Sequence, residues 1–465
     1  MNWLFIRLND GKRLIFAAAL AALWVLLAGG GNAPAITTNT VWCVPNTSIS
    51  PNCTSAAGKA TIQLAVTAAK PGDVILVGPG YYNELVNITK ANLSIFGAQA
   101  GKDAREDRHD PSKESIVDAT GQGGGPGGGA AFLQNAVNTV IDGFTIEGGT
   151  DGTGLYSSGI YVNANNIRIQ NNIIQNNSVG VYLYLYLYGL VQYNLFQTNN
   201  TGTPGSDDYL IPGPGLGIAN DSFYPLRISE NAFEGNLAAA MLNYSVGSTV
   251  ISQNTSKDDG AFAVFSYSTA FFDHNQGRDF GAKGFRPVYG ANNAEAAIEV
   301  ISDLEPSNIY TYGNQGLQID DNDLEKGQAD GYNGIAFSNI AGLPVPNSDP
   351  AICLYCAVSN NTTKGFAGNG IVAEAPASNG ALYYSMISGN QVEENGLDGI
   401  LIEKATNNQY NQLFDNKAQG NKVFDCEDDT TDSLSGTPPT ADTWYNNIGP
   451  LTSPKGICSQ GGWWH

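Results

Sequence analysis

The stretch that decides the fold is residues 159–183, which read GIYVNANNIRIQNNIIQNNSVGVYL. It opens with a small residue followed by apolar-x-apolar, Gly159-Ile-Tyr-Val, and the same motif returns 21 residues later as Gly180-Val-Tyr-Leu. Between them, Ile169 and Asn172 form a second motif, apolar-x-x-Asn. Alternation with a period of two indicates short strands with one buried face. The stretch therefore predicts a structural repeat built from short strands.

Both motifs recur along most of the chain. The first returns at Gly217, Ala239, Ala261, Ala297, Gly334, Gly370 and Gly399, and the second at Asn194, Asn231, Asn254, Asn275, Asn390 and Asn416. A unit this small cannot close a core alone, so we interpret each as one coil of a parallel β-helix. We expect the Asn at a corner, in αL geometry, bonded to the Asn of the next coil. Unrelated β-sandwiches, the alternative, would not keep both motifs in phase.

The composition restricts the partners. Lys and Arg number 22 against 43 Asp and Glu, so the net charge is −21. Such a chain repels polyanions, which disfavours nucleic acid and an anionic membrane surface as partners. A hydrophobic fraction of 42% excludes global disorder.

The two ends of the chain suggest export. Basic residues precede an apolar run that ends at Ala33-Pro34-Ala35, so residues 1–35 are interpreted as a secretory signal peptide, with an uncleaved membrane anchor as the alternative. We therefore expect a secreted or cell-surface protein without a membrane partner after cleavage. Six cysteines then suggest disulfides, and proximity favours Cys43–Cys53, Cys353–Cys356 and Cys426–Cys458. The C-x-x-C at Cys353 could instead be a redox or zinc site.

Residues 61–84 read TIQLAVTAAKPGDVILVGPGYYNE, a short helix over 61–69 followed by a strand over 74–84. This stretch resembles the N-terminal cap of exported right-handed parallel β-helix proteins of the pectate-lyase-like superfamily. The resemblance implies an all-β solenoid with a helical N-terminal cap, and the tail with Cys426 and Cys458 implies a disulfide-linked C-terminal cap. We expect the signal peptide over 1–35, the cap and first coils over 36–125, β-helix coils over 126–422 and the C-terminal cap over 423–465.

The motifs of several enzymes of this superfamily are missing. Polygalacturonase-like hydrolases carry G-H-G and R-I-K beside an Asp pair; here only Asp320-Asp321 is present. Mannuronan epimerases carry D-P-H-D, whereas this chain has Arg108-His109-Asp110-Pro111. Copper-delivery proteins need Met or His ligands, and this chain has only three Met and three His. Polysaccharide lyases that depend on calcium or on Arg and Lys have no single compact motif and remain open.

The longer repeats indicate where a site would lie. Insertions at about 197–216, 276–296, 301–313 and 338–352 flank the strand of the first motif, so they would wall a groove over one sheet. The outward positions on that strand give the predicted floor of the groove. The substrate-binding candidates there are Tyr161, Tyr182, Tyr184, Asp221, Asn243 and Glu299. The three tyrosines would form a platform for sugar rings; the alternative is that strand propensity selected them.

Charged residues give two sets of catalytic candidates. Glu374 and Glu403 occupy equivalent outward positions in consecutive coils, a spacing close to that of retaining glycosidases, and calcium could use the same pair. The other set lies in the second insertion and its start: His274, Arg278, Asp279, Lys283 and Arg286. Arg and Lys could neutralise a uronate carboxylate in a lyase reaction. The alternatives are solvated glutamates and local charge balancing.

The sequence therefore predicts a secreted β-helix protein that binds an extracellular polysaccharide in a loop-walled groove. As an enzyme, it would cleave that polysaccharide by lyase or hydrolase chemistry, with calcium as the one cofactor considered. The alternative is a non-catalytic cell-surface, adhesion or spacer protein.

Overall fold

The computed structural model divides into a unit of residues 1–39 and a unit of residues 40–465, and the second is described here by itself. The structure describes residues 39–53, 58–106, 108, 110–122, 129–150, 157–184, 188–200, 215–245, 247–281, 296–301, 314–327, 332–338, 352–374, 381–405, 408–430 and 441–459. The predicted signal peptide lies outside these residues.

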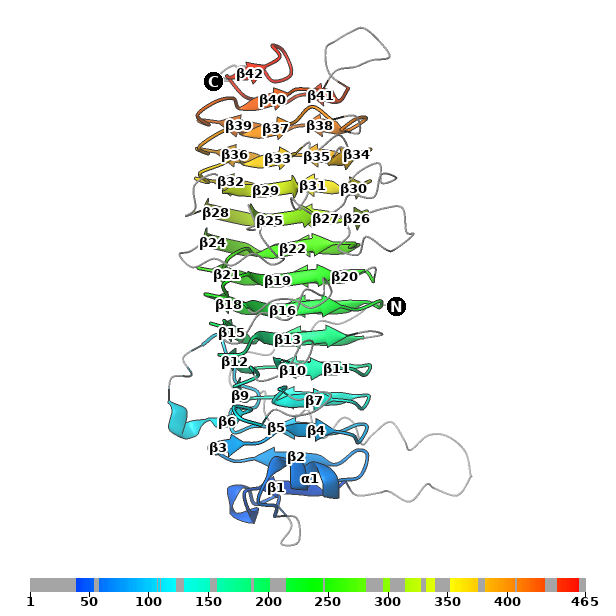
Figure 1. Cartoon of the computed structure of the whole chain (residues 1–465), viewed down its shortest axis with the longest axis vertical. Helices are drawn as coiled ribbons and strands as arrows, with labels where there is room; N and C mark the ends of the chain where they lie inside the picture. The colour runs from blue at the N-terminus through cyan, green and yellow to red at the C-terminus, as the bar shows by residue number, and fades with distance from the viewer. Residues whose placement is uncertain are drawn as a thin grey trace, which may run out of the picture. The chain divides into compact units, whose positions relative to one another are not determined.

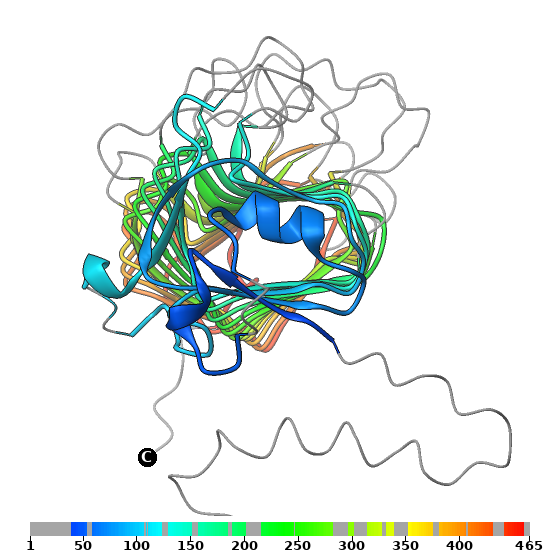
Figure 2. The ribbon, with the colours of Figure 1, turned by 90° about the horizontal axis from the view of Figure 1, so that it is seen from below.

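Three long parallel sheets, named A, B and C here, contain most of the strands, and each sheet takes one strand from each coil. The chain passes from sheet C to sheet A to sheet B and then enters sheet C of the next coil. The coils stack one above another (Figure 1), and a view along the stack shows the sheets as the sides of a closed cross-section (Figure 2). Consecutive parallel strands in this arrangement define a parallel β-helix.

The strands of sheet A are β1 Val41–Val44, β2 Val74–Val77, β5 Ser94–Phe96, β8 Thr139–Asp142, β11 Ile167–Gln170, β14 Gly189–Gln192, β17 Leu226–Ser229, β20 Thr249–Ser252, β23 Ala270–Asp273, β27 Gln318–Asp320, β31 Ala357–Ser359, β35 Met386–Ser388, β38 Gln412–Phe414 and β41 Thr443–Tyr445. Those of sheet B are β3 Gly80–Asn83, β6 Ser115–Asp118, β9 Thr145–Glu147, β12 Ile173–Gln175, β15 Leu195–Gln197, β18 Ala232–Glu234, β21 Thr255–Lys257, β24 Gln276–Phe280, β28 Asp323–Gly327, β32 Thr362–Lys364, β36 Gln391–Glu393 and β39 Lys417–Gln419.

Sheet C contains β4 Val86–Ile88, β7 Phe132–Gln134, β10 Ser158–Val162, β13 Val179–Tyr184, β16 Leu216–Asp221, β19 Ala239–Tyr244, β22 Ala263–Ser266, β25 Ala296–Ile301, β29 Asn333–Ser338, β33 Ile371–Ala373, β37 Ile400–Ile402, β40 Cys426–Asp428 and β42 Thr452–Ser453. A small fourth sheet of β26 Asn314–Gln315, β30 Cys353–Leu354 and β34 Leu382–Tyr383 lies between sheets C and A in the chain path. The helical segments are η1 Thr47–Ile49, α1 Ile62–Ala68 and η2 Pro111–Lys113.

The core fills the space inside the coils, because alternate residues of every strand point inward. One continuous cluster of buried apolar residues runs from Val44 to Cys458. Rings of neighbouring coils stack within it: the centroids of Phe196 and Phe233 lie 4.8 Å apart with an angle of 10° between their planes. The coils therefore share a single core rather than forming separate domains.

The asparagine motif forms the predicted ladder at the corner between sheets A and B. Ten residues take part: Asn172, Asn194, Asn231, Asn254, Asn275, Asn322, Asn361, Asn390, Asn416 and Asn447. The Nδ2 of each one except the last, Asn447, donates to the Oδ1 of the Asn in the next coil at 2.8–3.1 Å. The expected αL geometry at the Asn itself is wrong. The residue before it takes that conformation, as at Gln253 (φ 58°), which turns the Asn side chain inward.

The structures of the two ends agree in part with what the sequence predicts for the two caps. Thr61 Oγ1 accepts from Leu64 N and caps α1, and both oxygens of Glu84 accept from the first turn, at 2.9 Å each. The single strand expected over 74–84 is two strands, β2 in sheet A and β3 in sheet B, because the chain turns a corner at Gly78-Pro79. At the other end, β40, β41 and β42 extend sheets C and A.

The three predicted disulfides are confirmed. Cys43–Cys53, Cys353–Cys356 and Cys426–Cys458 have Cα separations of 5.9, 5.9 and 6.3 Å. The C-x-x-C pair is therefore a disulfide rather than a zinc site.

Candidate functional site

The three tyrosines expected as a sugar platform point outward from sheet C as predicted, but two of them are buried. Tyr161 on β10 and Tyr182 on β13 are each 2% exposed, and Tyr184 is half-buried. Their ring centroids lie 5.5–6.0 Å apart. They belong to a second apolar cluster on the outer face of sheet C, which also contains Leu216, Leu242 and Val264. The expectation of an open platform is therefore wrong for Tyr161 and Tyr182.

The other three floor candidates divide. Asn243 points inward, which corrects the predicted register: Asn220 of the previous coil donates to its Oδ1, at 2.6 Å, and Asn243 donates to Ser268. The error arises because this strand begins with a run of small residues. Ala240, rather than Ala239, lies opposite Gly217 of the previous coil in the sheet register. Asp221 ends β16 and is half-buried. Glu299 points outward, is 5% exposed and accepts from Ser338 Oγ at 2.9 Å.

Glu374 and Glu403 lie on consecutive coils, as the sequence predicts. They follow β33 and β37, whose residues Ala373 and Ile402 are register partners, and both are half-buried. Their catalytic role stays a prediction. The insertions that would wall a groove lie largely outside the described residues, as do Lys283 and Arg286.

Arg278 and Asp279 of the basic cluster lie in a strand and not in a loop. The second insertion, expected from about residue 276, therefore begins later than predicted. Residues Gln276–Phe280 form β24 of sheet B, with Arg278 pointing outward. Gly277 takes the inward position because a Cβ there would lie 2.3 Å from the Phe280 ring. Asp279 adopts φ 60°, which lets Phe280 turn into the core. Arg278 therefore lies on a different sheet from the tyrosines.

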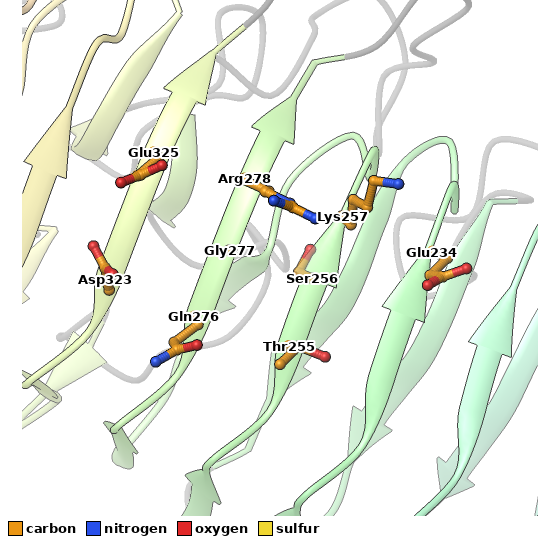
Figure 3. A pocket seen from close by; sticks show the side chains of 9 residues that line it. All are labelled: Glu234, Thr255, Ser256, Lys257, Gln276, Gly277, Arg278, Asp323 and Glu325. Carbon is orange, nitrogen blue, oxygen red and sulfur yellow. The ribbon is translucent and has the colours of Figure 1, made fainter. Parts of the chain in front are cut away.

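Arg278 lines an open depression of about 490 Å³ on the outer face of sheet B, called the sheet B depression here. Its lining comes from β18, β21, β24 and β28: Glu234, Thr255, Ser256, Lys257, Gln276, Gly277, Arg278, Asp323 and Glu325. Figure 3 shows these side chains on successive strands. Glu234, Lys257, Arg278 and Glu325 are register partners, so they form a row across four coils spaced about 4.8 Å apart.

No ion pair joins two of the four charged side chains in this row. Lys257 approaches its sequence neighbour Asp258 at 3.6 Å. Within the described part of the chain, the Arg278 guanidinium makes no ion pair or hydrogen bond, although Lys257 and Glu325 are its partners in register. Partial burial and then the nearby Glu325 raise the pKa of Asp323. The depression thus presents unused donors and acceptors side by side.

A second depression of about 530 Å³ adjoins the first at the corner between sheets A and B, and Thr255, Gln276 and Asp323 line both. His274 lies in it with φ 55°. Its Nδ1 is 3.0 Å from Asp273 Oδ2 and its Nε2 is 2.9 Å from Asp321 Oδ2. Asp273 precedes His274 in the chain, whereas Asp321 belongs to the next coil. His274 therefore ties two neighbouring coils together at the edge of the sheet B depression.

The sequence did not single out Lys257, Gln276, Asp323 or Glu325, yet it contains a signal for them. In each coil, the first and third residues after the ladder Asn point outward in sheet B, as Thr255 and Lys257 do after Asn254. Following these two positions from coil to coil would have found the row.

In the described ranges, no three His, Cys, Asp or Glu residues are grouped so that they could hold a metal ion. Nor is any helix among those ranges long and apolar enough to span a membrane.

Comparison with known proteins places the fold. Residues 110–277 match a family model described as a right handed beta helix region. No curated protein sequence matches the chain.

Solved structures share the fold at low identity. The catalytic unit of a GH87 alpha-1,3-glucanase from Streptomyces thermodiastaticus is 12% identical, covering 91% of this chain and 71% of that one, with a TM-score of 0.53. PfbA, a surface adhesin of Streptococcus pneumoniae, is 13% identical, covering 85% of this chain and 93% of that one, with a TM-score of 0.51. An alginate lyase from Paenibacillus sp. is 14% identical, covering 69% of this chain and 94% of that one, with a TM-score of 0.44. The chain therefore has the fold of a right-handed parallel β-helix.

Proposed function

We propose that this protein is secreted and binds an extracellular polysaccharide in the sheet B depression. The observation that carries the proposal is the row of Glu234, Lys257, Arg278 and Glu325, in which Arg278 has no partner among the described residues. Like charges in register, as at Lys257 and Arg278, destabilise a sheet. A bound ligand that accepts hydrogen bonds from both cations would offset this cost.

The chemistry of the depression suits a sugar polymer. Lys257, Arg278 and Gln276 can donate to hydroxyl, ring or carboxylate oxygens, while Glu234, Asp323 and Glu325 can accept from hydroxyls. The coils repeat the outward row along the solenoid, so a polymer lying along it meets several contacts in succession. Three disulfides agree with an extracellular location.

The structural neighbours are compatible with this proposal. One is named as a glucanase and another as a surface adhesin, so the shared fold occurs both in an enzyme and in a protein of the cell surface. A fold alone does not decide between these activities. The proposal therefore rests on the depression.

Cleavage is a second candidate, favoured by one pair of carboxyls. Asp323 and Glu325 are two positions apart on β28, which places their Cα atoms about 7 Å apart on one face. Inverting glycosidases use two carboxyl groups beside the scissile bond, one of them with a raised pKa. The pKa of Asp323 is raised, so Asp323 would be the acid and Glu325 the base. Asp323→Asn should then abolish the release of reducing ends while leaving binding within about threefold.

The binding proposal is tested on a panel of neutral and uronate-containing polysaccharides, by titration calorimetry with the secreted protein. Arg278→Ala should weaken binding at least about tenfold, which corresponds to about 1.4 kcal/mol. The matched control is Arg168→Ala, which removes an exposed arginine from β11 on sheet A and should change nothing. If no polysaccharide binds, or if both variants bind alike, the proposal is wrong.

A further inference from the structure

Three exposed tyrosines on consecutive coils lie far from the sheet B depression, at the edge where the chain passes from sheet C to sheet A. Tyr355 follows β30, Tyr384 follows β34, and Tyr410 follows Gln409, the bridge partner of Tyr383. Their exposed fractions are 64%, 46% and 43%. We call them the tyrosine ladder. They are thus the accessible counterpart of the buried tyrosines on sheet C.

The backbone at these positions does not favour tyrosine. Tyr355, Tyr384 and Tyr410 have φ values of 55°, 50° and 60°, in the left-handed region that bulky residues rarely adopt. The preceding coil has Gly316 at the same register position, with φ 64°. The corner therefore forms without an aromatic ring, and glycine is the residue that the backbone prefers there.

Hydrogen bonds that do not involve the rings hold this corner. The residue after each tyrosine points inward and links the coils: Cys356 N donates to Ser385 Oγ at 3.0 Å, and Ser385 N donates to Asn411 Oδ1 at 2.9 Å. These bonds use none of the tyrosine side chains. The rings are therefore not required to join one coil to the next.

The rings form a continuous aromatic surface parallel to the stack of coils. The centroids of Tyr355 and Tyr384 lie 5.8 Å apart, and those of Tyr384 and Tyr410 lie 5.0 Å apart, with angles of 26° and 14° between the planes. Tyr383 packs edge-on against Tyr384 and Tyr410. Burial first, and then the three ladder tyrosines, raise the pKa of Tyr383. The surface is aromatic and regular.

We propose that the tyrosine ladder is a second glycan-binding surface, which stacks on the C–H faces of uncharged sugar rings in a polysaccharide that runs along the solenoid. Aromatic rings at the pitch of the coils can meet successive rings of a polymer, and their hydroxyls can bond to sugar oxygens. The net charge of −21 repels an anionic polymer, which favours an uncharged one. This site is independent of the sheet B depression.

The experiment measures binding of the full chain to xylan, mannan, dextran and a linear glucan by affinity electrophoresis, at low and at 0.5 M salt. At 0.5 M salt, Tyr384→Leu, in the middle of the ladder, should weaken binding at least about fivefold, and Tyr355→Leu with Tyr384→Leu should abolish the binding that persists at this salt concentration. Tyr384→Trp should retain binding. Phe271→Ala, which removes an exposed ring from sheet A, should leave it unchanged, and Arg278→Ala is measured beside it to separate out binding in the sheet B depression.

Several outcomes separate this proposal from the alternatives. Stacking is insensitive to salt, whereas contacts to Arg278 are not. The proposal is overturned if the folded leucine variants bind as tightly as the native chain, if salt removes the binding, or if none of the four polysaccharides binds. A loss of melting temperature in the leucine variants without any glycan binding would assign the ladder a structural role only. Loss of binding in Arg278→Ala alone would leave only the sheet B proposal standing.

Discussion

At the scale of single residues, aspartate ends the polar ladders that asparagine extends. Asn177, Asn199 and Asn236 continue from coil to coil, and Asn236 donates to Asp259 Oδ1 at 2.8 Å. An asparagine donates to the next coil, whereas an ionised aspartate only accepts. Ser256 Oγ donates to the second oxygen of Asp259 at 2.6 Å. The side chain is fully buried, and burial raises its pKa to about 7.

This raised pKa predicts how Asp259 affects stability. The folded protein binds the proton more tightly than the unfolded chain, whose pKa is near 3.8, so stability decreases as the pH rises from about 4 to about 7. Asp259→Asn keeps a neutral side chain at all pH values. We expect it to raise the melting temperature by several degrees at pH 8 and little at pH 4.

The control for that measurement is Asp258→Asn, which removes a half-buried charge from the adjacent residue. Its melting temperature should follow the native pH dependence. A native protein whose melting temperature is the same at pH 5 and pH 8, or an Asp259→Asn variant that is less stable at pH 8, would contradict the assignment.

At the scale of elements, the corner ladders were predictable and their details were not. The apolar-x-x-Asn motif predicted a corner and its hydrogen bonds because its spacing repeats. It did not show that the preceding residue adopts αL, since Tyr193, Glu230 and Gln253 have no sequence preference in common there. Residue type decides such a position only when it is Gly or Asn.

The ladder at the corner of sheets A and B predicts a large cost for one deletion. Asn254 is 1% exposed, donates to Ile228 O and Asn275 Oδ1, and accepts from the backbone and side chain of Asn231. Asn254→Ala leaves those buried groups unpaired and should lower the free energy of unfolding by about 3 kcal/mol or more. Urea unfolding measures it. Gln253→Asn, at the exposed αL position, should stay within about 0.5 kcal/mol; equal effects would contradict the ladder's role.

Strand alternation predicted the direction of the sheet C tyrosines but not their burial. A period of two places Tyr182 on the outer face. Whether that side chain is buried depends on contacts with residues that are distant in sequence. Tyr182→Ala should therefore cost about 3 kcal/mol of unfolding free energy, as for other buried aromatic residues. Tyr355→Ala, at 64% exposure, should cost less than about 1 kcal/mol. Thermal unfolding of the two variants compares them directly, and similar losses would contradict the assigned burial.

At the scale of the whole molecule, the solenoid presents different chemistry on different faces. The apolar outer cluster lies on sheet C, the mixed-charge row on sheet B, and the tyrosine ladder at the edge toward sheet A. The sequence predicted the coils because their motifs are local. The sequence wrongly predicted Arg278 in one groove with Tyr182, because insertions of different length obscure which residues are register partners. Arg278 and Glu325 are such partners although 47 residues separate them. Contacts across such insertions become visible only when the coils are stacked.

The central claim is that a polysaccharide occupies the sheet B depression, and lysine footprinting by mass spectrometry tests it most directly. Lys257 lines the depression with 48% of its side chain exposed, while Lys113 in η2 is 69% exposed and lies outside it. With saturating polysaccharide, acylation of Lys257 should slow at least about fivefold and acylation of Lys113 should not change. Unchanged acylation of Lys257 under saturation would contradict the account.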